Sequence, residues 1–362
     1  MKPIKMKKIV LIVAATLMAV MSAQAQKIQV VDTDGYGIPL VSVLNEEGNM
    51  IGTTDLNGVL DDVKGTKKVM VTHVAYKPQV VTVASLTDGR ITMEDLNYTL
   101  QEIVVTPNPL LYVETYYRVY AFINDSLRFY QAGIMPNGYD MQKKKVEMGS
   151  HTNCCGDFCP AFGANVTWGA RVMSLDAGKV HESSAKLMRN GGEGSKAYFT
   201  TLKDEGNGRL RIENPEGLLG YIVKEGNLTH TTIDAGKAQM YRNKRLGENV
   251  VLKKREEKDY AYQYTDVFKM DENGNSSIED FVMDTNHWEW KGKKGRMKMV
   301  IETYATDRGY INKQDWNAKK KELKKAYKYP MTLDQLEAYA TSHNIPTLAP
   351  TMRRAIEGLK KK

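Results

Sequence analysis

Short apolar runs rich in β-branched residues alternate with turn residues over the first third of the chain. Three of these runs occupy Ile28–Val31, 40–44 and 69–72. The pairs Asp34-Gly35 and Asn57-Gly58 place glycine where a tight turn requires a positive φ. Short strands with a turn every roughly 8 to 12 residues are typical of an all-β sandwich. We therefore predict such a sandwich over residues 26–106.

A second β pattern follows the prolines at 107 and 109, which end the first one. Side chains between 112 and 123 alternate between two faces of a predicted strand. One face carries Val113, Thr115, Tyr117, Val119, Ala121 and Ile123, and the other carries Tyr112, Glu114, Tyr116, Arg118, Tyr120 and Phe122. Turn signals at 124–125, 204–208, 224–227 and 271–275 predict a series of hairpins. Residues 107–311 are thus expected to form a larger antiparallel β-rich domain of unassigned function.

The apolar period becomes helical near the end of the chain. Trp316, Lys320, Leu323 and Tyr327 fall on one helical face. Thr332 followed by Gln335 predicts a capping box, and further prolines separate two or three short helices. The predicted fold class is therefore mainly β, with a helical tail over 312–362 that packs on the second domain.

The start of the chain has the pattern of a secretory signal peptide over residues 1–25. Four lysines precede an apolar run at 9–21, and Ala23-Gln24-Ala25 supplies small residues for cleavage. The apolar run is shorter than the roughly 20 residues that a membrane-spanning helix needs. We expect an exported protein in the periplasm or associated with the outer membrane, with no transmembrane segment after cleavage.

Three segments of the predicted sandwich resemble a known family. They are 37–43 (Gly-Ile-Pro-Leu-Val-Ser-Val), 51–58 (Ile-Gly-Thr-Thr-Asp-Leu-Asn-Gly) and 73–76 (His-Val-Ala-Tyr). This order resembles the carboxypeptidase-regulatory-like family, a transthyretin-like β-sandwich found on many exported proteins of Bacteroidetes-type bacteria. Leu60 and Ala75 stand where that family usually has an aromatic residue and a glycine. The resemblance implies an accessory folding or docking module without chemistry of its own.

The segment 100–106 looks like the one that follows this module in TonB-dependent outer-membrane receptors. A receptor barrel needs about 22 strands of roughly 10 residues each, together with a plug, and the rest of this chain is too short for that. A scaffold that supports a separate receptor remains one alternative.

Charge and composition narrow the classes of partner. The formal net charge of +8 falls to +4 when the four lysines of the signal are removed. Basic runs are interleaved with acidic residues, which is typical of a solvated surface. An exported chain with this balance is not expected to bind nucleic acid, and an envelope protein, a peptide or a polysaccharide fits better.

All three cysteines lie in one short segment, beside a histidine. In an oxidising compartment Cys159 is expected to form a disulfide with Cys154 or Cys155. A zinc or copper site made of His151 and the three thiols is a weaker alternative. No other metal or cofactor signal is present in the sequence.

Trp288 and Trp290 fall on the same side of a predicted strand. An exposed pair would suit stacking on a sugar, and a buried pair would be ordinary sheet packing. With no complete catalytic set, the leading hypothesis is a non-enzymatic exported binding or envelope-assembly protein. The main alternative is a periplasmic hydrolase that acts on peptide or glycan with dispersed carboxylates.

Overall fold

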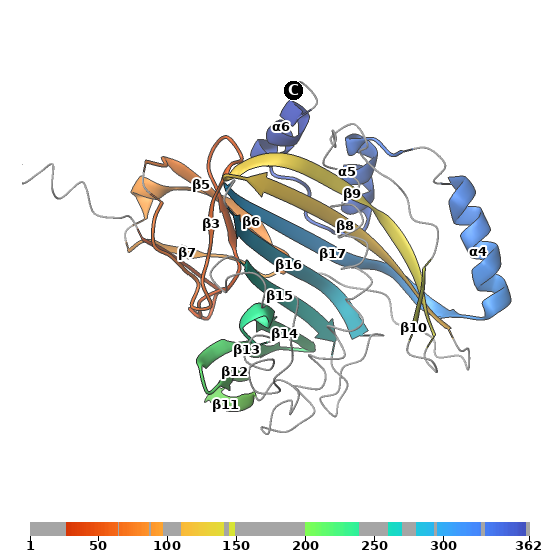
Figure 1. Ribbon diagram of the computed structural model, residues 1–362, viewed down its shortest axis with the longest axis horizontal. Coiled ribbons are helices and arrows are strands. Elements are labelled where there is room, and N and C mark those ends of the chain that lie inside the picture. Colours follow the sequence, from red (N-terminus) through yellow and green to blue (C-terminus); the bar gives the residue numbers. More distant parts are fainter. Residues whose placement is uncertain are drawn as a thin grey trace, which may run out of the picture.

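The computed structural model describes residues 27–63, 65–86, 88–96, 110–140, 145–148, 200–238, 260–269, 280–292, 295–326 and 330–359. Strands dominate these residues, and a few helices lie near the C-terminus (Figure 1). The predicted mainly β fold class is therefore confirmed.

Residues 27–96 contain two small sheets whose buried side chains belong to one apolar core. The first has the order β4 (Val59–Leu60), β1 (Ile28–Val31) and β7 (Arg90–Thr92). The second has the order β3 (Met50–Thr53), β2 (Ser42–Leu44), β5 (Lys68–His73) and β6 (Tyr76–Thr82). At one tight turn, a Cβ on Gly58 would lie 2.3 Å from the Val30 carbonyl oxygen, and its φ is +76°. Only glycine fits that turn without strain.

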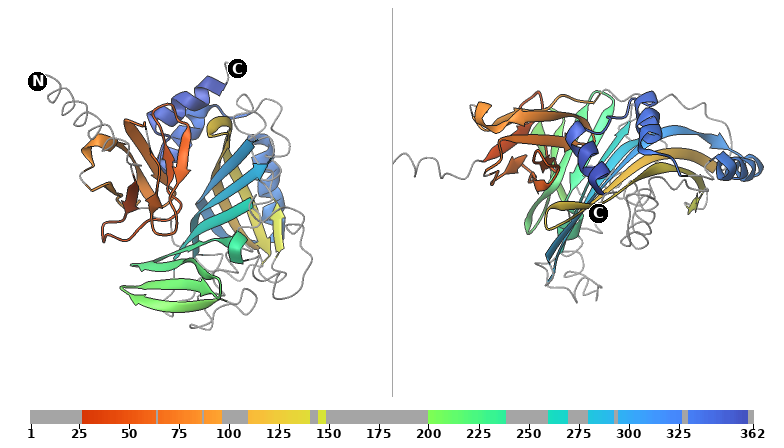
Figure 2. Two further views of the ribbon diagram at one scale, coloured as in Figure 1. Left: turned by 60° about the vertical axis from the view of Figure 1, so that its left-hand side comes forward. Right: turned by 90° about the horizontal axis from the view of Figure 1, so that it is seen from above.

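A ten-stranded antiparallel sheet forms the rest of the β structure. Its order is β10 (Lys145–Met148), β9 (Ser126–Asp140), β8 (Leu110–Ile123), β17 (Gly295–Ile311), β16 (Phe281–Gly292), β15 (Tyr260–Lys269), β14 (Leu228–Ile233), β13 (Gly217–Glu225), β12 (Arg209–Asn214) and β11 (Thr201–Gly206). The pairing of β8 with β17 joins segments that are far apart in the sequence. Figure 2 shows the small sheets beside this large, twisted sheet.

Over residues 116–122 the two faces of β8 are buried in different surroundings, as the alternation predicts, whereas Val113, predicted to lie on the face of Val119, belongs to the main core with Tyr116. Tyr116, Tyr120 and Phe122 belong to the main core, whereas Val119 and Ala121 belong to a separate cluster on the other face. The predicted turn after β8 is present, with positive φ at Asn124 and Asp125.

One apolar core continues from the sandwich into the sheet and the helices. It includes Val43 and Met70 of the sandwich, Tyr120 and Val300 of the sheet, and Ile356 near the C-terminus. Polar contacts add to this packing, because the Met50 amide donates to the Asp125 carbonyl at 2.9 Å. The boundary near residue 107 therefore marks a change of sheet within a shared core, and a division into independent domains stays a prediction.

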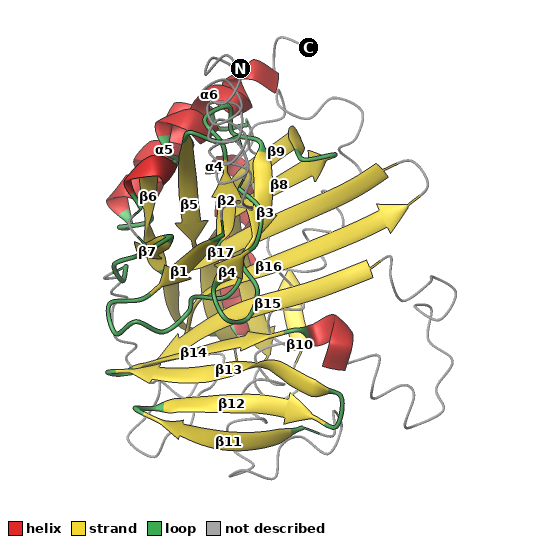
Figure 3. Cartoon of the chain, turned by 90° about the vertical axis from the view of Figure 1, so that its left-hand side faces the viewer, coloured by secondary structure: helices red, strands yellow, loops and turns green. Residues whose placement is uncertain are grey.

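Three α-helices follow β17 in the described part of the chain. They are α4 (Lys313–Ala326), α5 (Leu333–Ser342) and α6 (Pro350–Leu359). The capping box predicted at α5 is present, since Thr332 accepts from the Gln335 amide and the Gln335 side chain accepts from the Thr332 amide. Helices α5 and α6 lie at the same end of the molecule as β8 and β9 (Figure 3). None of the helices within the described ranges is long and apolar enough to cross a membrane.

Candidate functional site

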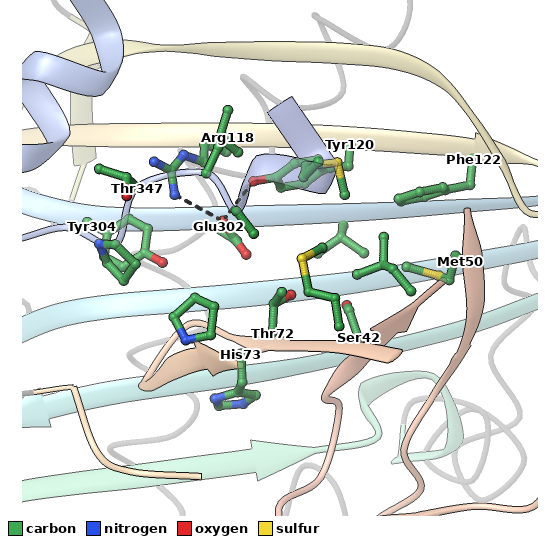
Figure 4. Close-up of a pocket in the computed structure, with 18 residues that line it drawn as sticks. Ser42, Met50, Thr72, His73, Arg118, Tyr120, Phe122, Glu302, Tyr304 and Thr347 are labelled. Atoms are coloured by element: carbon green, nitrogen blue, oxygen red, sulfur yellow. Dashed lines mark hydrogen bonds and ion pairs between the residues drawn. The ribbon is translucent and has the colours of Figure 1, made fainter. Parts of the chain in front are cut away.

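A cavity lies where the sandwich, the large sheet and the C-terminal segment meet (Figure 4). It holds about 560 Å³ of empty space, counted out to its open mouth. Most of its wall is apolar: Leu44, Met50, Met70, Pro78, Phe122, Val300, Tyr304, Pro346, Leu348, Ala349 and Met352. The polar contributions come from Ser42, Thr72, His73, Arg118, Tyr120, Glu302 and Thr347.

The register of β8 against β17 places two opposite charges side by side in this wall. Arg118 of β8 is the direct partner of Glu302 of β17, and Tyr120 is the partner of Val300. Directly opposite residues in an antiparallel pair have Cβ atoms about 4.5–5.5 Å apart. Both charged side chains point toward the sandwich, since they share the face of Tyr120 and Phe122.

Arg118 is the centre of a buried network. Its side chain is 3% exposed, and its Nη2 donates to Oε1 of Glu337 on α5 at 3.2 Å. Its Nε donates to the Tyr116 hydroxyl at 3.3 Å, and its Nη1 lies 3.9 Å from Oε2 of Glu302. The guanidinium is therefore in direct contact with Glu337 and only in a longer ion pair with Glu302.

Glu337 links this network to the wall of the cavity. Its Oε2 accepts the backbone N–H of Leu348 at 2.6 Å, while its Oε1 accepts from Arg118. Both carboxylate oxygens thus have partners. Because Leu348 lines the cavity, the segment between α5 and α6 is tied to β8 through a single acid.

Glu302 differs from Glu337 because only one of its carboxylate oxygens has partners among the described residues. The residue is 9% exposed, and its Oε2 accepts from the Tyr120 hydroxyl at 3.3 Å. Its other oxygen, Oε1, has no hydrogen-bond partner among the described residues. Burial raises the pKa of this carboxyl, and the neighbouring Arg118 and Tyr120 offset that only in part. Figure 4 shows Glu302 pointing between Tyr304 and Thr72 into the space.

The histidine at the edge of the cavity does not complete an acid–base set with Glu302. In Figure 4 the His73 ring points away from Glu302 and Arg118. Its Nδ1 accepts from the Ala75 amide at 3.2 Å, and burial lowers its pKa to about 3. His73 is therefore neutral at ordinary pH. The chemistry that this arrangement supports is the binding of an apolar group beside one open carboxylate.

A second arrangement of charged groups lies within the large sheet. Asp266 of β15 and Asp284 of β16 are direct cross-strand partners, and they are 0% and 1% exposed. The Asn286 side chain donates to Asp284 at 3.0 Å, yet burial raises the pKa of Asp284 to about 7. Because burial raises this pKa, the Asp284 carboxyl can hold a proton near neutral pH. No motif in the sequence marks Asp266 and Asp284 as a pair.

The two tryptophans proposed for sugar stacking lie in β16. Trp288 is partly buried, packs on the cluster that contains Val119, and stacks on Tyr262 with ring centroids 3.8 Å apart. It therefore lies on the opposite face of the sheet from the cavity. The backbone of Trp290 pairs with Tyr260 and Met297, and its side chain is outside the described part. Sugar stacking by this pair stays a prediction.

The proposed disulfide and metal site lie outside the described residues. His151, Cys154, Cys155 and Cys159 all fall in the segment 149–199. Within the described ranges, no group of three or more His, Cys, Asp or Glu side chains is placed to hold a metal ion.

The residues of the cavity network carried a weak signal in the sequence. Arg118 interrupts an otherwise largely aromatic strand face, and Glu302 follows the apolar pair Val300-Ile301. A charged residue within an apolar face is buried only when it is paired, so each of them indicated a partner without identifying it.

Comparison with known proteins does not assign this chain to a family. Neither the models of protein families nor the curated proteins include a match to this chain. The class of protein is therefore defined by its architecture: small β-sheets packed on a ten-stranded antiparallel sheet, with an apolar cavity at the junction.

Proposed function

We propose that this protein is an exported, non-enzymatic binding protein whose junction cavity takes up an apolar ligand. The apolar wall of the cavity is the observation that supports this most directly. Met50, Met70 and Met352 contribute to that wall from three different elements. Methionine side chains adapt to irregular ligands because they are unbranched and polarisable.

The sandwich has a defined part in this proposal. Its resemblance to the carboxypeptidase-regulatory-like family suggests an accessory module, and here Leu44, Met50 and Met70 of that module line the cavity. The signal-peptide pattern suggests a location in the periplasm or at the outer membrane. The ligand we propose is therefore an apolar part of an envelope component, such as a peptide or a lipid.

A cavity-filling substitution tests the proposal. Ala349 lines the cavity, and Ala349→Phe would occupy its space. Val80→Phe is the matched control, since Val80 is 59% exposed on the sandwich surface. We expect the native protein and the control to bind an apolar fluorescent probe such as 1-N-phenylnaphthylamine, and Ala349→Phe to lose that binding. Equal binding by all three proteins, or no binding by any, would refute the proposal.

One observation favours a hydrolase as the second candidate. The neighbouring carboxyls of Asp266 and Asp284 could supply the paired acid and base of peptide or glycan hydrolysis. Both side chains are buried, so substrate access would require the surrounding structure to move. Hydrolysis by the purified protein that disappears in Asp284→Asn, while the fold is retained, would favour this candidate over the first.

A further inference from the structure

The acid in the cavity points to the chemistry of the ligand. We propose that the cavity selects a ligand that carries a primary ammonium group on an apolar body, and that Glu302 binds this ammonium. The inference rests on the proposed binding function. Glu302 is nine-tenths buried, and its Oε1 has no hydrogen-bond partner among the described residues.

Most of the guanidinium of Arg118 is already engaged by the protein. Arg118 already donates to Glu337 at 3.2 Å and to the Tyr116 hydroxyl at 3.3 Å, and its side chain is only 3% exposed. The remaining nitrogen, Nη1, lies 3.9 Å from Oε2 of Glu302, so an anionic group that approached Arg118 from the cavity would also lie against the Glu302 carboxylate. A carboxylate or phosphate head group is therefore a poor fit for this cavity.

The balance of charges in the network also favours a cationic ligand over an anionic one. The network contains two carboxyls, Glu302 and Glu337, around one guanidinium. When both acids are ionised, one negative charge lacks a counterion among the residues that the structure describes, and such a charge is costly at a largely buried position. An entering ammonium supplies the missing positive charge. An entering anion would add a second uncompensated charge.

The aromatic residues of the wall suit the same ligand. Tyr120 and Tyr304 line the cavity on either side of Glu302 (Figure 4). Aromatic faces attract a cation in addition to providing apolar contact, and the effect grows where water is excluded. The polar end of the ligand would therefore lie between Glu302 and these rings, and its apolar body would extend toward Met50 and Met70.

Three probes with the same eight-carbon chain test this inference: octylammonium, octanol and octanoate. Calorimetric titration of the purified protein should give the tightest binding for octylammonium, weaker binding for octanol and the weakest for octanoate. Both octylammonium and octanol can donate a hydrogen bond to Glu302, so the difference between them is the charge of the ammonium; octylammonium should bind at least about 10-fold more tightly, which corresponds to about 1.4 kcal/mol.

The variant Glu302→Gln identifies the acid responsible. It should remove the preference for octylammonium over octanol and leave octanol binding within about 2-fold, since glutamine keeps the size of the side chain. Glu46→Gln, on the surface of the sandwich, is the matched control and should behave as the native protein does. Thermal unfolding shows whether each variant is folded.

The outcomes separate this inference from the proposed function. If none of the three probes binds, the proposed binding function is wrong. If octanol binds and octylammonium binds no more tightly, or if Glu302→Gln retains the preference, the ammonium assignment is wrong while the binding function stands. Two further arms distinguish the sources of such a group: a short-chain phosphatidylethanolamine presents an aminolipid, and trileucine amide presents a peptide N-terminus. Binding of either one that is lost in Glu302→Gln supports the assignment and identifies the source.

Discussion

Replacing Arg118 by methionine tests whether the buried network stabilises the fold. Methionine keeps much of the apolar packing that the arginine stem provides but removes the only cation of the network. Two carboxyls, Glu302 and Glu337, would then remain buried with no counterion in the described part of the chain. Removing one partner of a buried ion pair costs about 3–5 kcal/mol. Typical domains have a free energy of unfolding of about 5–15 kcal/mol, so this loss is a large fraction.

Urea unfolding, followed by tryptophan fluorescence and by circular dichroism, measures this cost. Arg353→Met is the matched control, because Arg353 also contacts two acids, Asp334 and Glu357, but is partly exposed. Exposed pairs contribute about 0.2–1 kcal/mol, so the control should change the free energy of unfolding by no more than that. If Arg118→Met costs no more than Arg353→Met, the network does not stabilise the fold and the reasoning is refuted.

Three further predictions concern stability. Asp284→Asn should remove a pH dependence of the free energy of unfolding. The pKa of Asp284 is raised to about 7 in the folded protein, so the native protein loses stability as pH rises from about 4 through 7, by up to about 4 kcal/mol. Urea unfolding at pH 5 and pH 8 should therefore show a gain for the variant that is larger at pH 8, and an equal effect at both values would contradict it. Thr332→Ala should lower the free energy of unfolding by about 1 kcal/mol, because it removes the acceptor of the capping box at α5; an unchanged urea midpoint would show that the cap contributes nothing. Glu302→Gln should leave the thermal midpoint at pH 8 unchanged or raised, since it leaves Arg118 and Glu337 as a balanced pair, and a large fall would mean that Glu302 is needed for folding.

Local patterns were sufficient to predict much of the fold. The two faces of β8, the turn at Asn124 and the capping box of α5 each depend on residues that are close in sequence. Hydrophobic alternation and side-chain capping act over a few residues, so a reader of the sequence can see both partners.

The site could not be predicted in the same way. Arg118, Glu302 and Glu337 come from β8, β17 and α5, and they meet only because β17 pairs with β8 in one particular register. A shift of that register by one residue would turn one of the two strand residues to the opposite face of the sheet. The alternation of β8 placed Arg118 on the correct face, but nothing local indicated that its partners would be two acids from the end of the chain. The shared core of sandwich and sheet was missed for the same reason.

The two acids of the network have different roles: Glu337 stabilises the fold, and Glu302 is available to a ligand. Both oxygens of Glu337 are engaged, one by Arg118 and one by the Leu348 amide, so this acid holds the wall of the cavity against the sheet. Glu302 is 3.9 Å from Arg118 and keeps one oxygen without a partner among the described residues, so it contributes less to the fold and more to the cavity. Loss of the Glu337 carboxylate should therefore lower stability, whereas loss of the Glu302 carboxylate should change ligand preference. Unfolding and binding measurements on Glu337→Gln and Glu302→Gln would separate the two roles, and identical effects of both variants on stability would show that the network acts as one structural unit.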